Sequence, residues 1–188
     1  MSSVARRGGR GAVMNRYDTA SWLDPRVVVA RSAIEGRGLF ARVAIEAGDV
    51  VARLGGEVLT DEEFRRRRLV KYSALAIGER LNLLLADDSP TNFGNHSCDA
   101  NLWMADEVTL VARRRIEPGE EVTVDYATHT AGLSGSMPCR CDGRDCRGVI
   151  TNEDWRRRDV QERYAGHFSP FLNLRIDRSL ATGAQASP

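Results

Sequence analysis

The chain has 188 residues, of which 42% are hydrophobic and 28% are charged, and its formal net charge is +1. This length accommodates one domain with a buried core and a small appendage. The balanced charge argues against direct nucleic-acid binding. No apolar run approaches the ~20 residues that cross a bilayer, so we expect no membrane-spanning segment.

The first residues predict a tail and an intracellular location. Residues 1–22 are rich in Arg and Gly and contain little that could be buried, so we expect them to be disordered. They lack the apolar stretch of a signal peptide, which predicts a cytoplasmic protein. In a reducing compartment, clustered cysteines indicate a metal site or catalysis more often than disulfides.

Residues 26–127 read as short strands separated by turns, which predicts a mainly β domain with short helices. The strands are predicted at residues 27–30, 39–40, 50–54, 108–112 and 121–126. Residues 60–63 (TDEE) form a capping-box pattern, which predicts a short helix that ends near residue 69.

The C-terminal part divides by composition into four segments. Residues 128–138 are small and rich in Gly and Ser, which predicts a flexible linker, and residues 139–148 hold three cysteines. Residues 149–180 predict a helical extension, with one helix capped by residues 151–154 and a second at 170–180. Residues 181–188 are expected to be a disordered tail.

The cysteines predict one structural zinc ion. The chain has four of them, one isolated and three in a tight group: Cys98, Cys139, Cys141 and Cys146. Four thiolates complete a closed tetrahedral site, and residues 142–145 supply the turn that the close spacing needs. The alternatives are four unrelated thiols, or a site in which His129 or His167 replaces one sulfur.

Three further features have simple explanations when each is taken alone. The Gly36-x-Gly38 pair can be a turn between strands or a place where a ligand approaches the backbone closely. Tyr126 follows a predicted strand, where most tyrosines pack with a hydrated hydroxyl group. Residues 95–101 (NHSCDAN) are a polar string around the isolated cysteine.

Taken in order, these motifs resemble those of a known protein family. The sequence Gly-x-Gly, NHSCxxN, EEVTVDY and Cys-x-Cys-x4-Cys is similar to that of the SET-domain protein lysine methyltransferases with a post-SET zinc segment. The resemblance covers about residues 27–148. It implies a SET-domain β-clip-like fold, in which residues 95–98 and 125–126 meet in a knot-like crossing.

The resemblance also implies a site. S-adenosylmethionine would bind on one face, a peptide bearing a lysine on the other, and Tyr126 would be the catalytic residue at the mouth of a narrow channel between them. The zinc segment would close both pockets. The cofactor contacts implied by the resemblance are Gly36, Arg37, Gly38, Asn95 and His96.

The chemistry of methyl transfer suits these residue types. In-line displacement depends on alignment, and the lysine must first lose a proton, which at its free pKa costs about 4 kcal/mol near neutral pH. A dry channel beside a sulfonium lowers that cost. Because a tyrosine with a pKa near 10 stays protonated, we expect Tyr126 to orient the amine, with water as the route for the proton.

The sequence departs from the family pattern at three positions that matter here. Ala100 replaces the usual Pro, Leu54 replaces a frequent Tyr, and Val124 replaces a Phe or Tyr that influences how many methyl groups are added. Leu54 and Val124 would make the substrate channel roomier, which predicts that di- or trimethylation is permitted.

Two other functions are considered beside the enzyme. One is an inactive, zinc-stabilised binding module of the same fold, which the combination of Tyr126 with Asn95 and His96 argues against. The other is a zinc protein that binds RNA or DNA, which depends only on the Arg-rich runs.

Overall fold

The computed structural model describes residues 16–67, 73–131 and 135–181. Both terminal tails lie mainly outside these ranges, as do the predicted end of the first helix and the centre of the predicted linker. No helix in the described part of the chain is long and apolar enough to cross a membrane.

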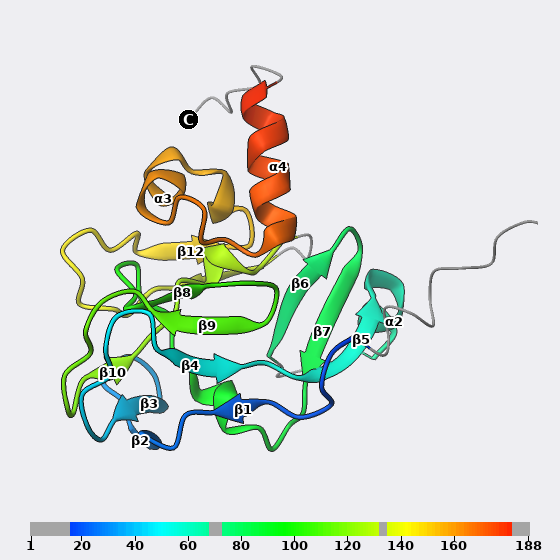
Figure 1. Ribbon diagram of the computed structural model, residues 1–188. Coiled ribbons are helices and arrows are strands. Elements are labelled where there is room, and N and C mark those ends of the chain that lie inside the picture. Colours follow the sequence, from blue (N-terminus) through cyan, green and yellow to red (C-terminus); the bar gives the residue numbers. More distant parts are fainter. Residues whose placement is uncertain (1–15, 68–72, 132–134, 182–188) are drawn as a thin grey trace, which may run out of the picture.

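The described chain is mainly β, as predicted, with small antiparallel sheets and short helices (Figure 1). The four-stranded sheet has the order β1 (Trp22–Leu23), β4 (Val50–Arg53), β9 (Thr109–Ala112), β8 (Leu102–Met104). The second sheet is β10 (Glu121–Val122), β3 (Arg37–Ala41), β2 (Val27–Arg31), and the third is β5 (Gly56–Thr60), β7 (Leu81–Leu85), β6 (Ala74–Gly78). A two-stranded ribbon pairs β11 (Ser136–Pro138) with β12 (Val149–Thr151).

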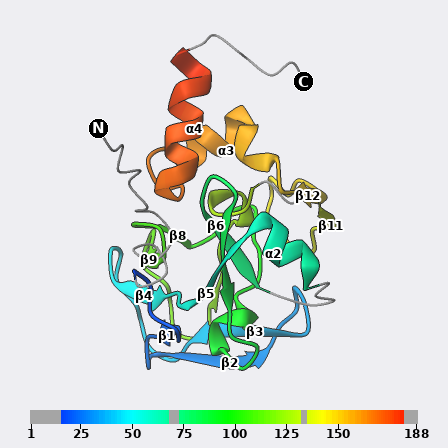
Figure 2. The ribbon, with the colours of Figure 1, turned by 90° about the vertical axis from the view of Figure 1, so that its right-hand side faces the viewer.

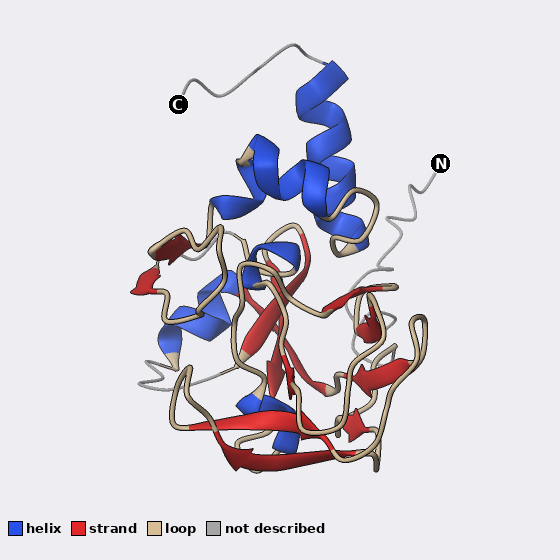
Figure 3. Ribbon diagram, turned by 90° about the vertical axis from the view of Figure 1, so that its left-hand side faces the viewer, coloured by secondary structure: helices blue, strands red, loops and turns tan. Residues whose placement is uncertain are grey.

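Three α-helices and three 3-10 turns complete the described elements. They are α2 (Asp61–Arg66), α3 (Arg158–Arg163), α4 (Pro170–Ala181), η1 (Pro90–Phe93), η2 (Tyr126–Thr128) and η3 (Asp154–Arg156). Figures 1 and 3 show α3 and α4 gathered at one end of the molecule, beyond the sheets. In Figure 2, α2 lies on the opposite side of β6 from β8 and β9.

The chain has two main apolar cores. The larger one lies between the sheets and contains fully buried aliphatic side chains such as Ile45, Val51, Leu83 and Val122. The second joins alanines of the β domain to large side chains of the C-terminal part. Its members are Ala76, Ala100, Ala127, Ala131, Trp155, Val160, Tyr164, Phe168, Leu172 and Ile176.

The capping box is confirmed. The Thr60 hydroxyl accepts from the backbone N–H of Glu63, whose carboxylate accepts from the backbone N–H of Thr60. The helix ends at Arg66, earlier than predicted.

The strand predicted at 121–126 is too long, because it ends at Val122. The carboxylate of Asp125 accepts the backbone N–H of Ala127 at 3.0 Å and caps η2. Tyr126 therefore begins a 3-10 turn rather than ending a strand.

The helix cap predicted at 151–154 is also wrong. Thr151 belongs to β12, and its hydroxyl bonds Asp154 and the backbone of Glu153. The α-helix starts only at Arg158. Within the predicted linker 128–138, residues 136–138 pair as β11, so this part is regular structure.

The predicted meeting of residues 95–98 with residues 125–126 is confirmed by the backbone bonds of Val124, the residue just before the second segment. The N–H of Val124 donates to the carbonyl of Asn95 at 3.1 Å, and the N–H of Ser97 donates to the carbonyl of Val124 at 3.3 Å. Val124 thus bridges in parallel to His96, and also to Leu102. These bonds hold the polar string against the segment that carries Tyr126.

Candidate active site and metal centre

The four cysteines lie together, although the first precedes the second by 41 positions. Their Sγ atoms all lie within 4.8 Å of one another, with Cys98 and Cys139 at 3.7 Å and Cys139 and Cys141 at 3.3 Å. All four are free thiols rather than disulfides. A tetrahedral zinc with Zn–S bonds of about 2.3 Å would place its sulfurs about 3.8 Å apart, so the cluster fits this ion closely.

Backbone N–H groups around the sulfurs support the same interpretation. Cys98 donates to Sγ of Cys141 at 3.5 Å, and Arg147 donates to Sγ of Cys98 at 3.3 Å. Burial raises the pKa of Cys141, but N–H donors, including those of Cys98 and Gly143, outweigh burial and lower it to about 7. These donors favour the thiolate of Cys141, the form that binds metals, whereas burial raises the pKa of Cys98 and that of Cys139.

Tyr126 is held by groups on both of its ends. Its N–H donates to Nδ1 of His96 at 3.3 Å, and its hydroxyl donates to the carbonyl of Gly94 at 2.9 Å. Burial raises the pKa of its phenol to about 12. The hydroxyl thus stays protonated, gives its proton to Gly94, and leaves its oxygen lone pairs free to accept.

A cavity of about 310 Å³ lies beside this tyrosine. Its wall is mainly apolar and includes both predicted channel residues, Leu54 and Val124, together with Tyr126 and Gly94. His129 also lines it. Burial lowers the pKa of His129 to about 4, so this ring is neutral at physiological pH.

The predicted cofactor residues also come together, outside the wall of that cavity. The side-chain amide of Asn95 donates to the carbonyls of Arg37 at 3.1 Å and Glu35 at 3.3 Å, and to Oε1 of Glu121 at 2.7 Å. Arg37 is exposed, with its guanidinium 4.0 Å from the centre of the Phe93 ring. His96 is buried, and burial together with the nearby Arg147 lowers its pKa to about 3.

The structure requires glycine at positions 36 and 38 for different reasons. Gly36 has φ +46°, a left-handed conformation that a side chain disfavours. A Cβ at Gly38 would lie 2.0 Å from Oε1 of Glu121 and 3.0 Å from Nδ2 of Asn95. The second glycine therefore lets the Glu121–Asn95 pair pack against β3, which the sequence did not reveal.

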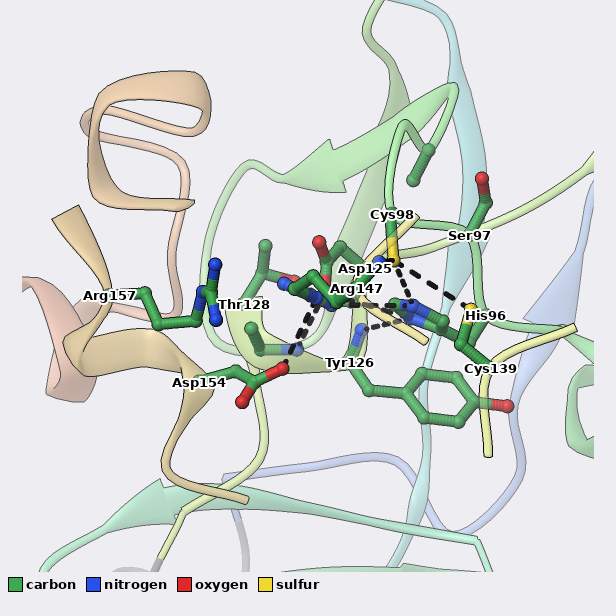
Figure 4. A network of polar contacts seen from close by, with 12 residues as sticks. His96, Ser97, Cys98, Asp125, Tyr126, Thr128, Cys139, Arg147, Asp154 and Arg157 are labelled. Atoms are coloured by element: carbon green, nitrogen blue, oxygen red, sulfur yellow. Dashed lines mark hydrogen bonds and ion pairs between the residues drawn. The ribbon is translucent and has the colours of Figure 1, made fainter. Parts of the chain in front are cut away.

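A buried polar network was also missed (Figure 4). Arg147, the residue after Cys146, has a side chain that is only 4% exposed. Its Nη2 donates to Oδ1 of Asp125 at 2.8 Å, and its Nε lies 3.2 Å from Oδ2 of Asp154. Burial raises the pKa of Asp125, and the guanidinium opposes that rise. The only hint in the sequence is that Arg147 directly follows a metal-type cysteine.

Ala100 has a specific partner where the family's proline would have none. Its N–H donates to the hydroxyl of Tyr164 at 3.1 Å, and that hydroxyl lies 3.4 Å from the carbonyl of Cys98. Arg163 donates to the same carbonyl at 2.5 Å. The end of α3 therefore fixes the loop that carries the first cysteine.

Comparison with known proteins identifies the family of the β domain. Residues 36–127 match the family model of the SET domain. Histone-lysine N-methyltransferase ash1 of Drosophila melanogaster is 32% identical over 152 residues, which cover 70% of this chain and 7% of that protein. Human histone-lysine N-methyltransferase 2B is 34% identical over 145 residues, or 66% of this chain and 5% of that protein.

A solved structure shows the same fold. The methyltransferase domain of human histone-lysine N-methyltransferase SETMAR aligns with a TM-score of 0.54 and 23% identity, covering 67% of this chain and 58% of that one. Fold and site together define a SET-type β domain followed by a cysteine-rich segment. The chain belongs to the SET-domain family, as its sequence motifs predicted. It spans only a small part of the length of ash1 and of histone-lysine N-methyltransferase 2B.

Proposed function

We propose that this chain transfers methyl groups from S-adenosylmethionine to the side-chain amine of a lysine in a protein substrate. The observation that carries the proposal is the position of Tyr126 on the wall of an apolar cavity of about 310 Å³. Apolar walls suit the four methylenes of a lysine, and the phenol oxygen suits its amine.

The cavity assists the loss of the lysine proton. Removing an ammonium from water favours its neutral form, because desolvation penalises charge. Tyr126 is no base, since its pKa lies near 12. Its hydroxyl donates to Gly94 and accepts an N–H of the amine, so the amine lone pair is oriented away from the phenol. The neutral ring of His129 adds no charge to this wall.

The cofactor residues fit S-adenosylmethionine by their chemistry. The exposed guanidinium of Arg37 suits its carboxylate, and Gly36 and Gly38 leave the backbone open around it. The side chain of Asn95 fixes the start of β3 by its bond to the carbonyl of Arg37. His96 accepts the backbone N–H of Tyr126 and so holds residues 95–98 against the turn of Tyr126. When bound, the cofactor supplies the methyl group as a sulfonium.

The cysteine cluster would hold one zinc ion with a structural role. All four protein ligands are sulfur, so no position is left open for a substrate. Arg140 of the same segment pairs with Glu35, beside the proposed cofactor residues. This ion pair brings the segment next to the proposed cofactor residues.

The relatives suggest the first substrates to assay. They are named as histone-lysine N-methyltransferases, and several fungal ones, among them that of Candida glabrata, as specific for H3 lysine-36. We therefore propose a basic, lysine-bearing peptide of the histone H3 type as substrate. A cytoplasmic location, without membrane or nucleic-acid partners, stays a prediction.

The test uses zinc-loaded protein, methyl-labelled S-adenosylmethionine, a histone H3 peptide and a cell extract. We expect label on lysines, mapped by mass spectrometry, and a drop of roughly 100-fold with Tyr126→Phe, because one oriented polar contact at the reacting group is lost. Tyr17→Phe is the matched control, because Tyr17 does not line the cavity. Cofactor binding without any label in either substrate would favour the binding module instead.

A further inference from the structure

Arg147 touches both the metal centre and the turn that carries Tyr126. Its backbone N–H donates to Sγ of Cys98 at 3.3 Å, while its guanidinium donates to Asp125 at 2.8 Å. One residue of the cysteine segment therefore contacts a metal ligand and the neighbour of Tyr126 (Figure 4).

Asp125 in turn sets the backbone of Tyr126. It is fully buried, and its carboxylate caps η2, the 3-10 turn that Tyr126 begins. The guanidinium also lies 3.3 Å from Nε2 of His96, whose Nδ1 accepts the N–H of Tyr126. Asp125 and His96, two of the groups that hold the backbone around Tyr126, are thus in contact with Arg147.

The charges of this cluster depend on the same residue. Asp125 and Asp154 are buried carboxylates, and both lie against the one guanidinium. A planar fork can serve two carboxylates at once, whereas an ammonium is a single point of charge. Removing the guanidinium would leave two buried acids without a cation, which is far more damaging than losing a surface ion pair.

We propose that Arg147 is a positioning residue that couples occupancy of the four-cysteine site to the orientation of Tyr126. This inference depends on the proposed function in one respect, the catalytic role of Tyr126. When the sulfurs close around zinc, the backbone of Arg147 is fixed at Cys98, and its side chain holds Asp125 and the turn. Without the metal, the cysteine segment is free to shift and the turn loses this support.

The test follows Tyr126 directly, without turnover. The chain has four tyrosines, so protein labelled with 3-fluorotyrosine gives four fluorine resonances, and Tyr126→Phe identifies one of them. In the wild type, we expect this resonance to move when a chelator removes zinc. In Arg147→Gln that still holds zinc by elemental analysis, it should already be displaced and should no longer respond.

Two further variants make the result specific. Arg147→Lys should restore the wild-type position only in part, and Arg157→Gln, an exposed arginine paired with Asp159, should behave as wild type. If Arg147→Gln cannot be loaded with zinc, the comparison is made with Arg147→Lys. A zinc response in the variant equal to that of the wild type overturns the proposal.

Activity gives a second, separable reading. Loss of such a supporting contact typically costs 10- to 100-fold in activity, so Arg147→Gln should lower kcat by that factor and leave the KM for peptide within threefold. A change in the KM for peptide with an unchanged kcat would contradict a positioning role for Arg147. If the resonance responds as expected but no substrate is ever methylated, the coupling stands and the proposed function fails.

Discussion

At the scale of single residues, we expect Val124 to set how much room the substrate amine has. Val124 and Leu54 both line the cavity, where larger aromatic side chains would reduce its volume. We expect the wild type to form di- or trimethyl-lysine and Val124→Tyr to stop earlier, because a phenol would fill the space that added methyl groups need.

Mass spectrometry of the product on one saturating peptide checks this. Val124→Ile, which changes size but adds no ring or hydroxyl, is the matched control and should keep the wild-type product. A wild-type enzyme that stops at monomethyl-lysine would refute the interpretation of a roomy channel.

His129, also at the scale of single residues, is expected to make the stability of the protein depend on pH. Its Nδ1 lies 3.2 Å from the Thr128 hydroxyl, its ring lies edge-on to Tyr126, and the nearby His96 is also neutral. Burial lowers its pKa to about 4, against 6.5 when unfolded. The unfolded chain therefore binds the proton first, so stability present above pH 6.5 is lost as the pH falls toward 4.

We expect this histidine to cost about 1.4 kcal/mol of unfolding free energy per pH unit in that window. Urea unfolding at pH 7.0 and 5.5, compared between wild type and His129→Gln, isolates it, because acid release of zinc affects both proteins. Equal losses in the two proteins would show that His129 is not buried as a neutral ring.

At the scale of elements, the end of α3 and the loop of Cys98 act as one unit. Because proline has no N–H, Ala100→Pro would remove the bond to Tyr164 and leave that hydroxyl without its donor. We expect a loss of roughly 1–3 kcal/mol for Ala100→Pro and about 1 kcal/mol for Tyr164→Phe.

A double-mutant cycle measures the coupling. If the N–H of Ala100 and the hydroxyl of Tyr164 are partners, the double variant loses clearly less than the sum of the single losses. Simple additivity would mean that the proline acts only through backbone strain.

Elements with local signals could be predicted, and those set by distant partners could not. Val27–Arg31 and the Thr60 capping box follow from neighbouring residues. The β6–β7 hairpin was missed because its turn contains Arg80 at φ 60°, a conformation for which Gly or Asn is the usual signal.

The candidate site divides in the same way. The cysteines and Tyr126 were found from motifs, whereas Arg147 was not, because its meaning depends on Asp125, 22 residues away along the chain. Glu121 was missed for a similar reason. Its role appears only when β10 pairs with β3 and brings it against Asn95 and Gly38.

At the scale of the whole molecule, the two apolar cores are expected to unfold together. Alanines of the β domain pack directly against Trp155 and Leu172, and Arg147 joins the cysteine segment to Asp125 of the domain and Asp154 of the extension. Although residues 149–180 were predicted as a separate extension, these buried links favour one cooperative unit.

Two leucines of α4 test that cooperativity. Leu172 is fully buried and Leu174 is 56% exposed, so Leu172→Ala should cost about 2–5 kcal/mol and Leu174→Ala less than about 0.5 kcal/mol. In one cooperative unit, Leu172→Ala lowers the denaturation midpoint of the sheets and of zinc release by the same amount. Far-UV circular dichroism and a zinc-sensitive dye, read in the same titration, compare the two. An extension that unfolds first, while zinc and the sheets keep the wild-type midpoint, would show instead that residues 149–180 are an independent appendage.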